Sequence, residues 1–276
     1  MKVALVVLAL FGVSLAASID NIEIPPSKNI YVEPINQPEV DPSLEIVNGQ
    51  EVVPHSIPYQ IFLVASAGET SWTCGGSLIT KRYVLTAAHC IQGAKSVHVT
   101  LGAHNLAKHE ASKVTVNGRS WVIHEKYDST NIDNDIGVIQ LERNLTLTRS
   151  IQLARLPSLR DVGINLEGRT ATVSGWGLTN GIFQTTTDVL RANNTIISNK
   201  ECNDVFKIVQ PTEVCLSIAG GRSACSGDSG GPLVIDNVQH GIVSYGSSYC
   251  RSTPSVFTRV SSYLNWLQTH SEWRAQ

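Results

Sequence analysis

The stretch CSGDSGGPLV, residues 225–234, places one serine, Ser229, among three glycines and directly after an acid. Crowded glycines indicate a backbone that adopts conformations or close approaches that side chains forbid. Two interpretations follow. The stretch is either a tight surface turn before the apolar run 232–235, or a bend that holds a nucleophile beside bare backbone N–H groups. The rest of the chain decides between them.

Two segments at the start of the chain differ in composition from the rest. Residues 1–17, MKVALVVLALFGVSLAA, combine Lys2, an apolar run and small residues at the end. This is the layout of a secretory signal peptide, whereas the run is short for a membrane anchor. Residues 18–45 hold five of the eleven prolines, six acids, one base and no cysteine, so we expect an extended propeptide. The globular part is then 46–276, and we expect it to be secreted.

The globular part carries 19 bases and 17 acids, a net charge near +2, which indicates neither nucleic acid nor a membrane surface as a partner. Six cysteines in a secreted chain indicate three disulfides, although the pattern alone allows about 15 pairings. A zinc site is the alternative, but the sequence contains no CxxC pair, so we expect no metal and no cofactor. The cysteines are Cys74, Cys90, Cys202, Cys215, Cys225 and Cys250.

Short runs rich in Val, Ile, Thr and Tyr alternate with clusters of Gly, Asn and Ser, a pattern typical of strands and turns. The predicted strands include 59–65, 96–101, 137–141, 170–174, 240–245 and 255–260. Helical spacing is clear only near the C-terminus, where Val260, Leu264 and Leu267 follow one another behind the possible caps Ser261 and Ser262. We predict an all-β body, as one large or two small barrels, that ends in a helix.

A serine hydroxyl needs a base within hydrogen-bond reach to act as a nucleophile at neutral pH. Among eight histidines, His89 stands out in LTAAHC, residues 85–90. Asp135, which opens the apolar strand in NDIGVIQL, is a candidate to orient that imidazole. Each has a plainer explanation: a packed histidine in the first case, and an acid capping the 131–134 loop in the second.

The string around Ser229 also matches G-x-S-x-G, the nucleophile elbow of α/β-hydrolases. That elbow requires a strand, a turn and then a helix, with the acid and the histidine after the serine. In this chain an apolar strand follows Ser229, while His89 and Asp135 both precede it. The order of the three residues therefore argues against an α/β-hydrolase.

Six motifs occur together and in order: IVNG at 46–49, LTAAHC at 85–90, DIGVIQL at 135–141, SGWG at 174–177, GDSGGP at 227–232 and SYGSSYC at 244–250. From Ile46 to about Leu267 the chain resembles a serine protease of the chymotrypsin family, the family from which the general Ser-His-Asp template was itself drawn. The resemblance implies two packed six-stranded antiparallel β-barrels with a C-terminal α-helix. The active site would lie between the barrels.

The resemblance also implies the catalytic roles. Ser229 would attack the peptide carbonyl of a protein or peptide substrate, and His89 would take its proton and later give it to the leaving amine. Asp135 would hold His89 in the required tautomer. The backbone N–H groups of Gly227 and Ser229 would form the oxyanion hole. The implied disulfides are Cys74–Cys90, Cys202–Cys215 and Cys225–Cys250, a set of three that resembles invertebrate digestive members of the family.

Members of this family are made as zymogens. The resemblance implies that cleavage frees the amine of Ile46, and that the ammonium then pairs with Asp228. The family usually has Arg or Lys before the new terminus, whereas this chain has Glu45. We therefore expect an activating protease other than trypsin. The resemblance also implies a monomer that meets protease inhibitors.

The resemblance places the pocket for the residue before the scissile bond at three positions: Ser223 at the base, with Gly246 and Ser255 at the walls. Neutral Ser223 supplies no counter-charge for Arg or Lys, and Gly246 leaves the entrance open. We predict a preference for large apolar side chains. An elastase-like or broad collagenolytic preference is the alternative.

Three further features bear on function. The calcium-binding loop of the family needs paired acids. In this chain Ala103 stands where one of them is expected, so Glu110 is the one carboxylate in the loop and we expect no bound calcium. Asn144 and Asn193 each begin an N-x-T sequon for glycosylation. A non-catalytic protease homologue that serves as a binding protein is the alternative of a different class, and the intact set of catalytic residues argues against it.

Overall fold

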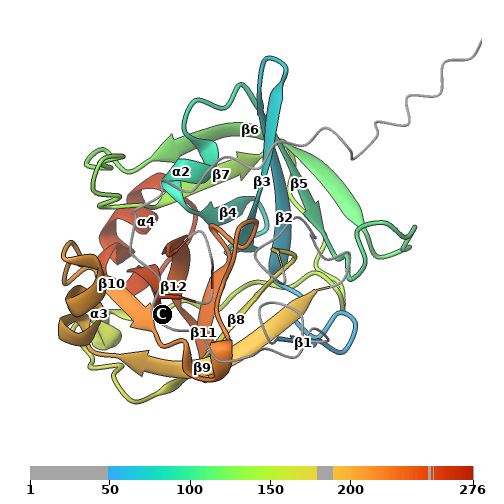
Figure 1. Cartoon of the computed structure of the whole chain (residues 1–276). Coiled ribbons are helices and arrows are strands. Elements are labelled where there is room, and N and C mark those ends of the chain that lie inside the picture. Colours follow the sequence, from blue (N-terminus) through green and yellow to red (C-terminus); the bar gives the residue numbers. More distant parts are fainter. Residues whose placement is uncertain (1–48, 179–188, 248–249, 251, 276) are drawn as a thin grey trace, which may run out of the picture.

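The structure, a computed structural model, describes residues 49–178, 189–247, 250 and 252–275 (Figure 1). The predicted signal peptide 1–17, the predicted propeptide 18–45 and Ile46 lie outside the described residues.

The first half of the described chain forms a closed antiparallel barrel with the strand order β2-β3-β4-β7-β6-β5. A short helix, α2 (Ala88–Ile91), follows β4. The strands are β2 (Gln60–Ala67), β3 (Thr70–Leu78), β4 (Tyr83–Thr86), β5 (Ser96–Leu101), β6 (Val114–Ile123) and β7 (Gly137–Leu141).

The second half forms another antiparallel barrel in the order β9-β10-β13-β12-β11-β8, which pairing between β8 and β9 closes. Strand β1 (Gln50–Glu51) adds to the free side of β9. The six strands are β8 (Thr170–Gly175), β9 (Leu190–Ile197), β10 (Glu213–Leu216), β11 (Pro232–Ile235), β12 (Val238–Tyr245) and β13 (Ser255–Arg259). The predicted fold of two six-stranded barrels is confirmed.

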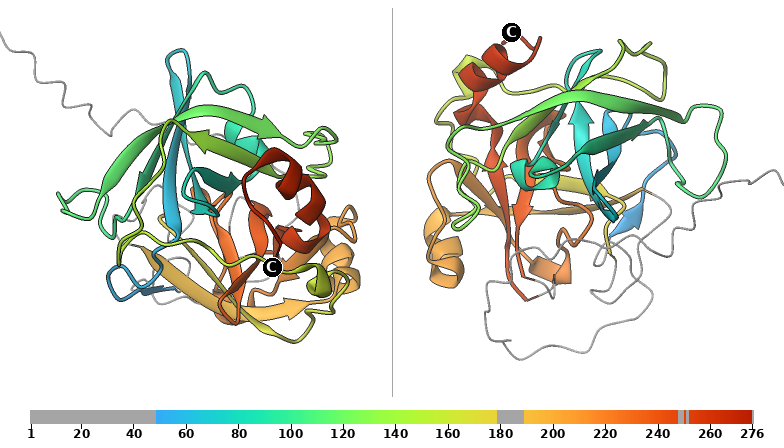
Figure 2. Two further views of the ribbon diagram at one scale, coloured as in Figure 1. Left: turned by 180° about the vertical axis from the view of Figure 1, so that it is seen from behind. Right: turned by 90° about the horizontal axis from the view of Figure 1, so that it is seen from above.

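Helical structure joins and ends the barrels. Helix α3 (Asn199–Phe206) precedes β10, and α4 (Leu264–His270) ends the chain, as predicted. Residues Val260–Ser262, expected within or next to that helix, form a separate 3-10 turn. Two other such turns are Leu159–Asp161 and Ala219–Gly221. Helix α4 is seen beside the first barrel in Figure 2.

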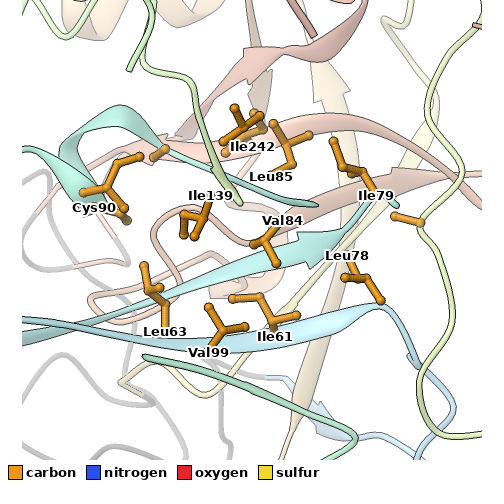
Figure 3. Close-up of a cluster of buried hydrophobic side chains, with 14 of the residues drawn as sticks. Ile61, Leu63, Leu78, Ile79, Val84, Leu85, Cys90, Val99, Ile139 and Ile242 are labelled. Atoms are coloured by element: carbon orange, nitrogen blue, oxygen red, sulfur yellow. The ribbon is translucent and has the colours of Figure 1, made fainter. Parts of the chain in front are cut away.

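Alternation of side chains builds each core. In β5, Val97, Val99 and Leu101 are fully buried, whereas the residues between them face outward. Side chains from neighbouring strands meet them inside the first barrel (Figure 3). The same cluster includes Ile242 of β12 and Leu267 of α4, so the C-terminal part of the chain packs on the first barrel and holds the two halves together.

The two barrels also meet through hydrogen bonds beside the serine bend. The Gly75 N–H of β3 donates to Ser229 O at 2.7 Å, and Ser174 Oγ of β8 donates to Gln60 Oε1 of β2 at 2.8 Å. These bonds fix the position of Ser229 relative to the first barrel.

The packing of the second barrel can be tested at Phe257, which belongs to its buried apolar cluster. Its side chain is 0% exposed, so we expect Phe257→Ala to lower the free energy of unfolding by about 3–5 kcal/mol. Leu159→Ala is the matched control, because Leu159 is 56% exposed and a change there should fall within about 0.5 kcal/mol. Urea denaturation in a Ser229→Ala background, which prevents self-digestion, measures both. If both substitutions lowered the free energy of unfolding by the same amount, the burial of Phe257 in the core would be contradicted.

Candidate active site

The bend around Ser229 needs its glycines. Gly227 and Gly230 have φ values of +96° and +78°, a region that other residues rarely adopt. A Cβ on Gly230 would also lie 2.6 Å from the Gly75 carbonyl oxygen. Within the bend, the Asp228 N–H donates to Cys225 O at 3.0 Å. Of the two interpretations of this stretch, the structure therefore favours a bend with close backbone approach.

The carboxylate of Asp228 lies beneath this bend with no exposure to water. Its oxygens accept the N–H groups of Gly177, at 2.9 Å, and Cys225, at 3.0 Å. A Cβ on Gly177 would stand 2.5 Å from Asp228 Oδ2, and one on Gly175 would clash with Oδ1. The SGWG motif therefore leaves space for the acid. Burial raises the pKa of Asp228 to about 6, while the two backbone hydrogen bonds act in the opposite direction.

Two backbone donors on the bend are available to a ligand. Among the residues that the structure describes, neither the N–H of Gly227 nor that of Ser229 donates to another group. Because both lie on the bend that carries the serine hydroxyl, they can meet a negatively charged oxygen that forms there.

His89, in α2, is paired with Asp135, which precedes β7. His89 Nδ1 lies 2.8 Å from Asp135 Oδ2, and the backbone N–H of His89 donates to Oδ1 at 3.0 Å. Asp135 is fully buried, whereas the His89 side chain is 24% exposed. The carboxylate fixes the proton on Nδ1, which leaves Nε2 as the basic nitrogen.

The environment of Asp135 fixes its orientation and the basicity of His89. Ser244 Oγ donates to Asp135 Oδ2 at 2.6 Å, and Thr258 Oγ1 donates to the Asp135 carbonyl at 2.8 Å. Burial lowers the pKa of His89, but the charge and hydrogen bond of Asp135 outweigh it, so the pKa is raised. Sequence reasoning missed Ser244, although it lies in the SYGSSYC motif.

Within the described ranges no hydrogen bond joins His89 Nε2 to Ser229 Oγ, and Cys90 Sγ lies 3.7 Å from Nε2. Catalytic hydrogen bonds of unliganded enzymes often tighten only when substrate binds. His89 also lies within 4.8 Å of the sulfurs of Cys74 and Cys90, but those sulfurs form a disulfide and offer no thiolate to a metal.

A hollow that is open to solvent lies beside Ser229. Two of the predicted pocket residues, Gly246 and Ser255, line it. Ser223 does not lie at its wall: it is 1% exposed, and its hydroxyl donates to the Cys250 carbonyl. The described residues that line it are Ala224, Cys225, Ser226, Ser229, Val243, Ser244, Tyr245, Gly246, Ser247, Cys250 and Ser255.

Three disulfides join segments that are apart in the described chain. The structure joins Cys74–Cys90 next to His89, Cys202–Cys215 between α3 and β10, and Cys225–Cys250 between the serine bend and the hollow. These are the pairs that the family resemblance implies. Removing such a bridge from a secreted domain typically costs about 2–5 kcal/mol.

The structure also bears on the predicted calcium loop, on the two glycosylation sequons and on membrane-spanning helices. Both oxygens of Glu110 accept backbone N–H groups, from His104 at 2.7 Å and from Asn105 at 2.9 Å. The sequon residues Asn144 and Asn193 are exposed. Within the described residues, no helix has the length and apolar character needed to cross a lipid bilayer.

The fold and the Ser229, His89 and Asp135 arrangement agree with a comparison of the sequence with known families. The family described as Trypsin matches residues 46–267, so the chain belongs to the trypsin family and is a serine endopeptidase that acts on peptide substrates. The resemblance to the chymotrypsin family is confirmed, and the alternative of a non-catalytic homologue is set aside.

Individual relatives span the same region. Brachyurin of Leptuca pugilator is 43% identical over 229 residues, covering 82% of this chain and 98% of that protein. Cathepsin G of Homo sapiens is 38% identical over 228 residues, covering 82% and 87%. A solved structure described as HL collagenase superposes with a TM-score of 0.76 at 34% identity, covering 83% of this chain and 99% of the other.

The raised pKa of His89 can be tested through Asp135. Removal of the negative charge in Asp135→Asn leaves burial to act alone, so we expect the pKa of His89 to fall. The acid limb of activity, where His89 loses its proton, would then move to lower pH. An NMR titration of ¹⁵N-labelled histidine measures this in a Ser229→Ala background. The exposed ring of His98, which pairs with Asn117, is the internal control. An unchanged or higher pKa at His89 would contradict the assigned cause.

Proposed function

We propose that this chain is a secreted serine endopeptidase, made as a zymogen, that cleaves after large apolar residues. The observation that carries the mechanism is the pairing of His89 with buried Asp135 beside the bend that carries Ser229. Ser229 Oγ attacks the peptide carbonyl while His89 Nε2 takes its proton. His89 then protonates the leaving amine, and water hydrolyses the acyl-enzyme. The N–H groups of Gly227 and Ser229 stabilise the oxyanion, each worth about 3 kcal/mol of barrier in typical cases.

The chemistry of the hollow supports the preference for apolar residues. None of the described side chains that line it carries a charge, so these residues offer no counter-charge to a buried Lys or Arg of a substrate. At Gly246 a Cβ would be in ordinary van der Waals contact with the Pro254 carbonyl oxygen at 3.7 Å, and glycine keeps any side chain out of the hollow at this wall. Ser255 narrows the inner end, and neutral Ser223 behind the lining adds no charge.

A broad collagenolytic preference is the second candidate. Brachyurin and the HL collagenase structure are relatives of this chain, and the latter is a collagenase by its description. An elastase-like preference would differ in favouring small residues before the scissile bond.

Activation depends on Asp228. A buried carboxylate without a cation is unfavourable, and the raised pKa of Asp228 reflects that cost. In the proposed mature enzyme the ammonium of Ile46, freed by a protease that cuts after Glu45, pairs with Asp228 and stabilises the bend. The signal peptide at 1–17 and three disulfides support secretion, and inhibitors that occupy the hollow are further expected partners.

The experiment is hydrolysis of a peptide library varied at the residue before the scissile bond, with protein that begins at Ile46. We expect cleavage after Phe, Tyr, Leu or Met, with basic residues at least about 100-fold poorer because a desolvated cation lacks a partner. Ser229→Ala is the control and should cleave nothing. Cleavage after small residues would move the enzyme to the elastase-like class, and preferred cleavage after Arg or Lys would contradict the account of the hollow.

A further inference from the structure

Tyr245 lines the hollow and also belongs to a buried apolar cluster that includes Phe206 of α3. Tyr245, at the end of β12, lines the hollow together with Ser229 and Gly246, and it is only 5% exposed. Behind it, Phe206 of α3 meets the ring edge to face, with centroids 5.5 Å apart and an interplanar angle of 89°. Tyr245 therefore belongs both to the lining of the hollow and to the cluster at α3, so a shift of Tyr245 would change the shape of the hollow.

A buried acid holds the polar end of that ring. The hydroxyl of Tyr245 donates to Glu213 Oε2 at 3.2 Å, and the Gln210 N–H donates to the same oxygen at 2.7 Å. Glu213, the first residue of β10, is 3% exposed. Its carbonyl oxygen accepts Asn199 Nδ2 at 3.2 Å and Arg259 Nη2 at 3.4 Å. The backbone of Glu213 is thus fixed, and its carboxylate is directed at the tyrosine.

No cation pairs with this carboxylate among the described residues. Asp133 and Asp135 face it from the segment before β7, and Tyr263 lies near it from the C-terminal turn. On β13, Arg259 contacts only its backbone carbonyl. Burial raises the pKa of Glu213 to about 7, although the bonds from Gln210 and Tyr245 lower it. Burial also raises the pKa of Tyr245, so its hydroxyl stays protonated and acts as a donor.

We propose that Glu213 is a positioning residue for substrate binding, which holds the Tyr245 wall through its carboxylate and does not touch the substrate. The proposal rests on the proposed function, in which the substrate side chain enters the hollow beside Tyr245. An ionised carboxylate is a stronger acceptor than a protonated one. The Tyr245 ring is therefore held most firmly when Glu213 is ionised. Substrate binding weakens as the pH falls and Glu213 becomes protonated.

The test compares KM and kcat of the enzyme beginning at Ile46 between pH 6 and 8. In the wild type we expect KM to rise about five-fold toward pH 6, since a hydrogen bond to a charged group is lost. Glu213→Gln keeps the size and an acceptor oxygen but cannot titrate, so its KM should be nearly constant with pH. The kcat profile, which reports His89, should be the same in both. Glu142→Gln, an exposed acid on the first barrel, should behave as the wild type.

Tyr245→Phe provides a second variant that removes the hydroxyl and keeps the ring. It should abolish the pH dependence of KM even with Glu213 intact, and Glu213→Gln should then add nothing further. The proposal would be overturned if the wild type and Glu213→Gln had the same dependence of KM on pH. It would also be overturned if Glu213→Gln changed only kcat. A wild-type enzyme that hydrolyses no peptide would instead refute the proposed function on which the proposal rests.

Discussion

The carboxylate of Asp228 is the group around which the active site is arranged. It lies fully buried beneath the bend, accepts two backbone N–H groups, and occupies space that the glycines of SGWG leave open. The same bend carries Ser229 and the two backbone N–H groups, of Gly227 and Ser229, that bond no other group in the described part of the chain. A change in how this acid is neutralised would therefore act on Ser229 and on the two backbone donors together, which is the physical basis of the proposed control by the Ile46 amine.

The second constraint is the relative position of the two barrels. His89 and Asp135 come from the first barrel and Ser229 from the second, so the catalytic geometry depends on contacts between them. The Gly75 N–H bonds the carbonyl of Ser229, and Ser244 of the second barrel donates to Asp135 of the first. Ser229 and Asp135 are thus each bonded by a residue of the opposite barrel, so a small relative shift of the barrels would change the distance between Ser229 and His89.

Most strands and turns of the fold can be predicted from the sequence. Alternating apolar residues indicate strands and glycine-rich clusters indicate turns, and both patterns are local and recur along the chain. Contacts between distant segments are harder to predict. Ser244 lies in one of the family motifs, yet its bond to Asp135 depends on the packing of the barrels. Glu213 has the sequence context of an ordinary strand acid, and only the fold brings the Tyr245 hydroxyl to its carboxylate. The sequence predicts Ser223 at the base of the pocket, but it cannot predict that this hydroxyl is buried and bonds the Cys250 carbonyl. Helix α3 is eight residues long, too short for a clear periodic pattern.

The most direct test of this account is the rate at which a fluorophosphonate labels Ser229, located by peptide mass spectrometry. Three proteins are compared: the chain beginning at Ile46, the chain beginning at Ser18, and the Ile46 form carrying Asp228→Asn. If the buried carboxylate and a paired ammonium organise the bend, only the first protein labels rapidly, with one label per chain on Ser229. Equal labelling rates in all three would show that the bend forms without that pair and would contradict the central role of Asp228.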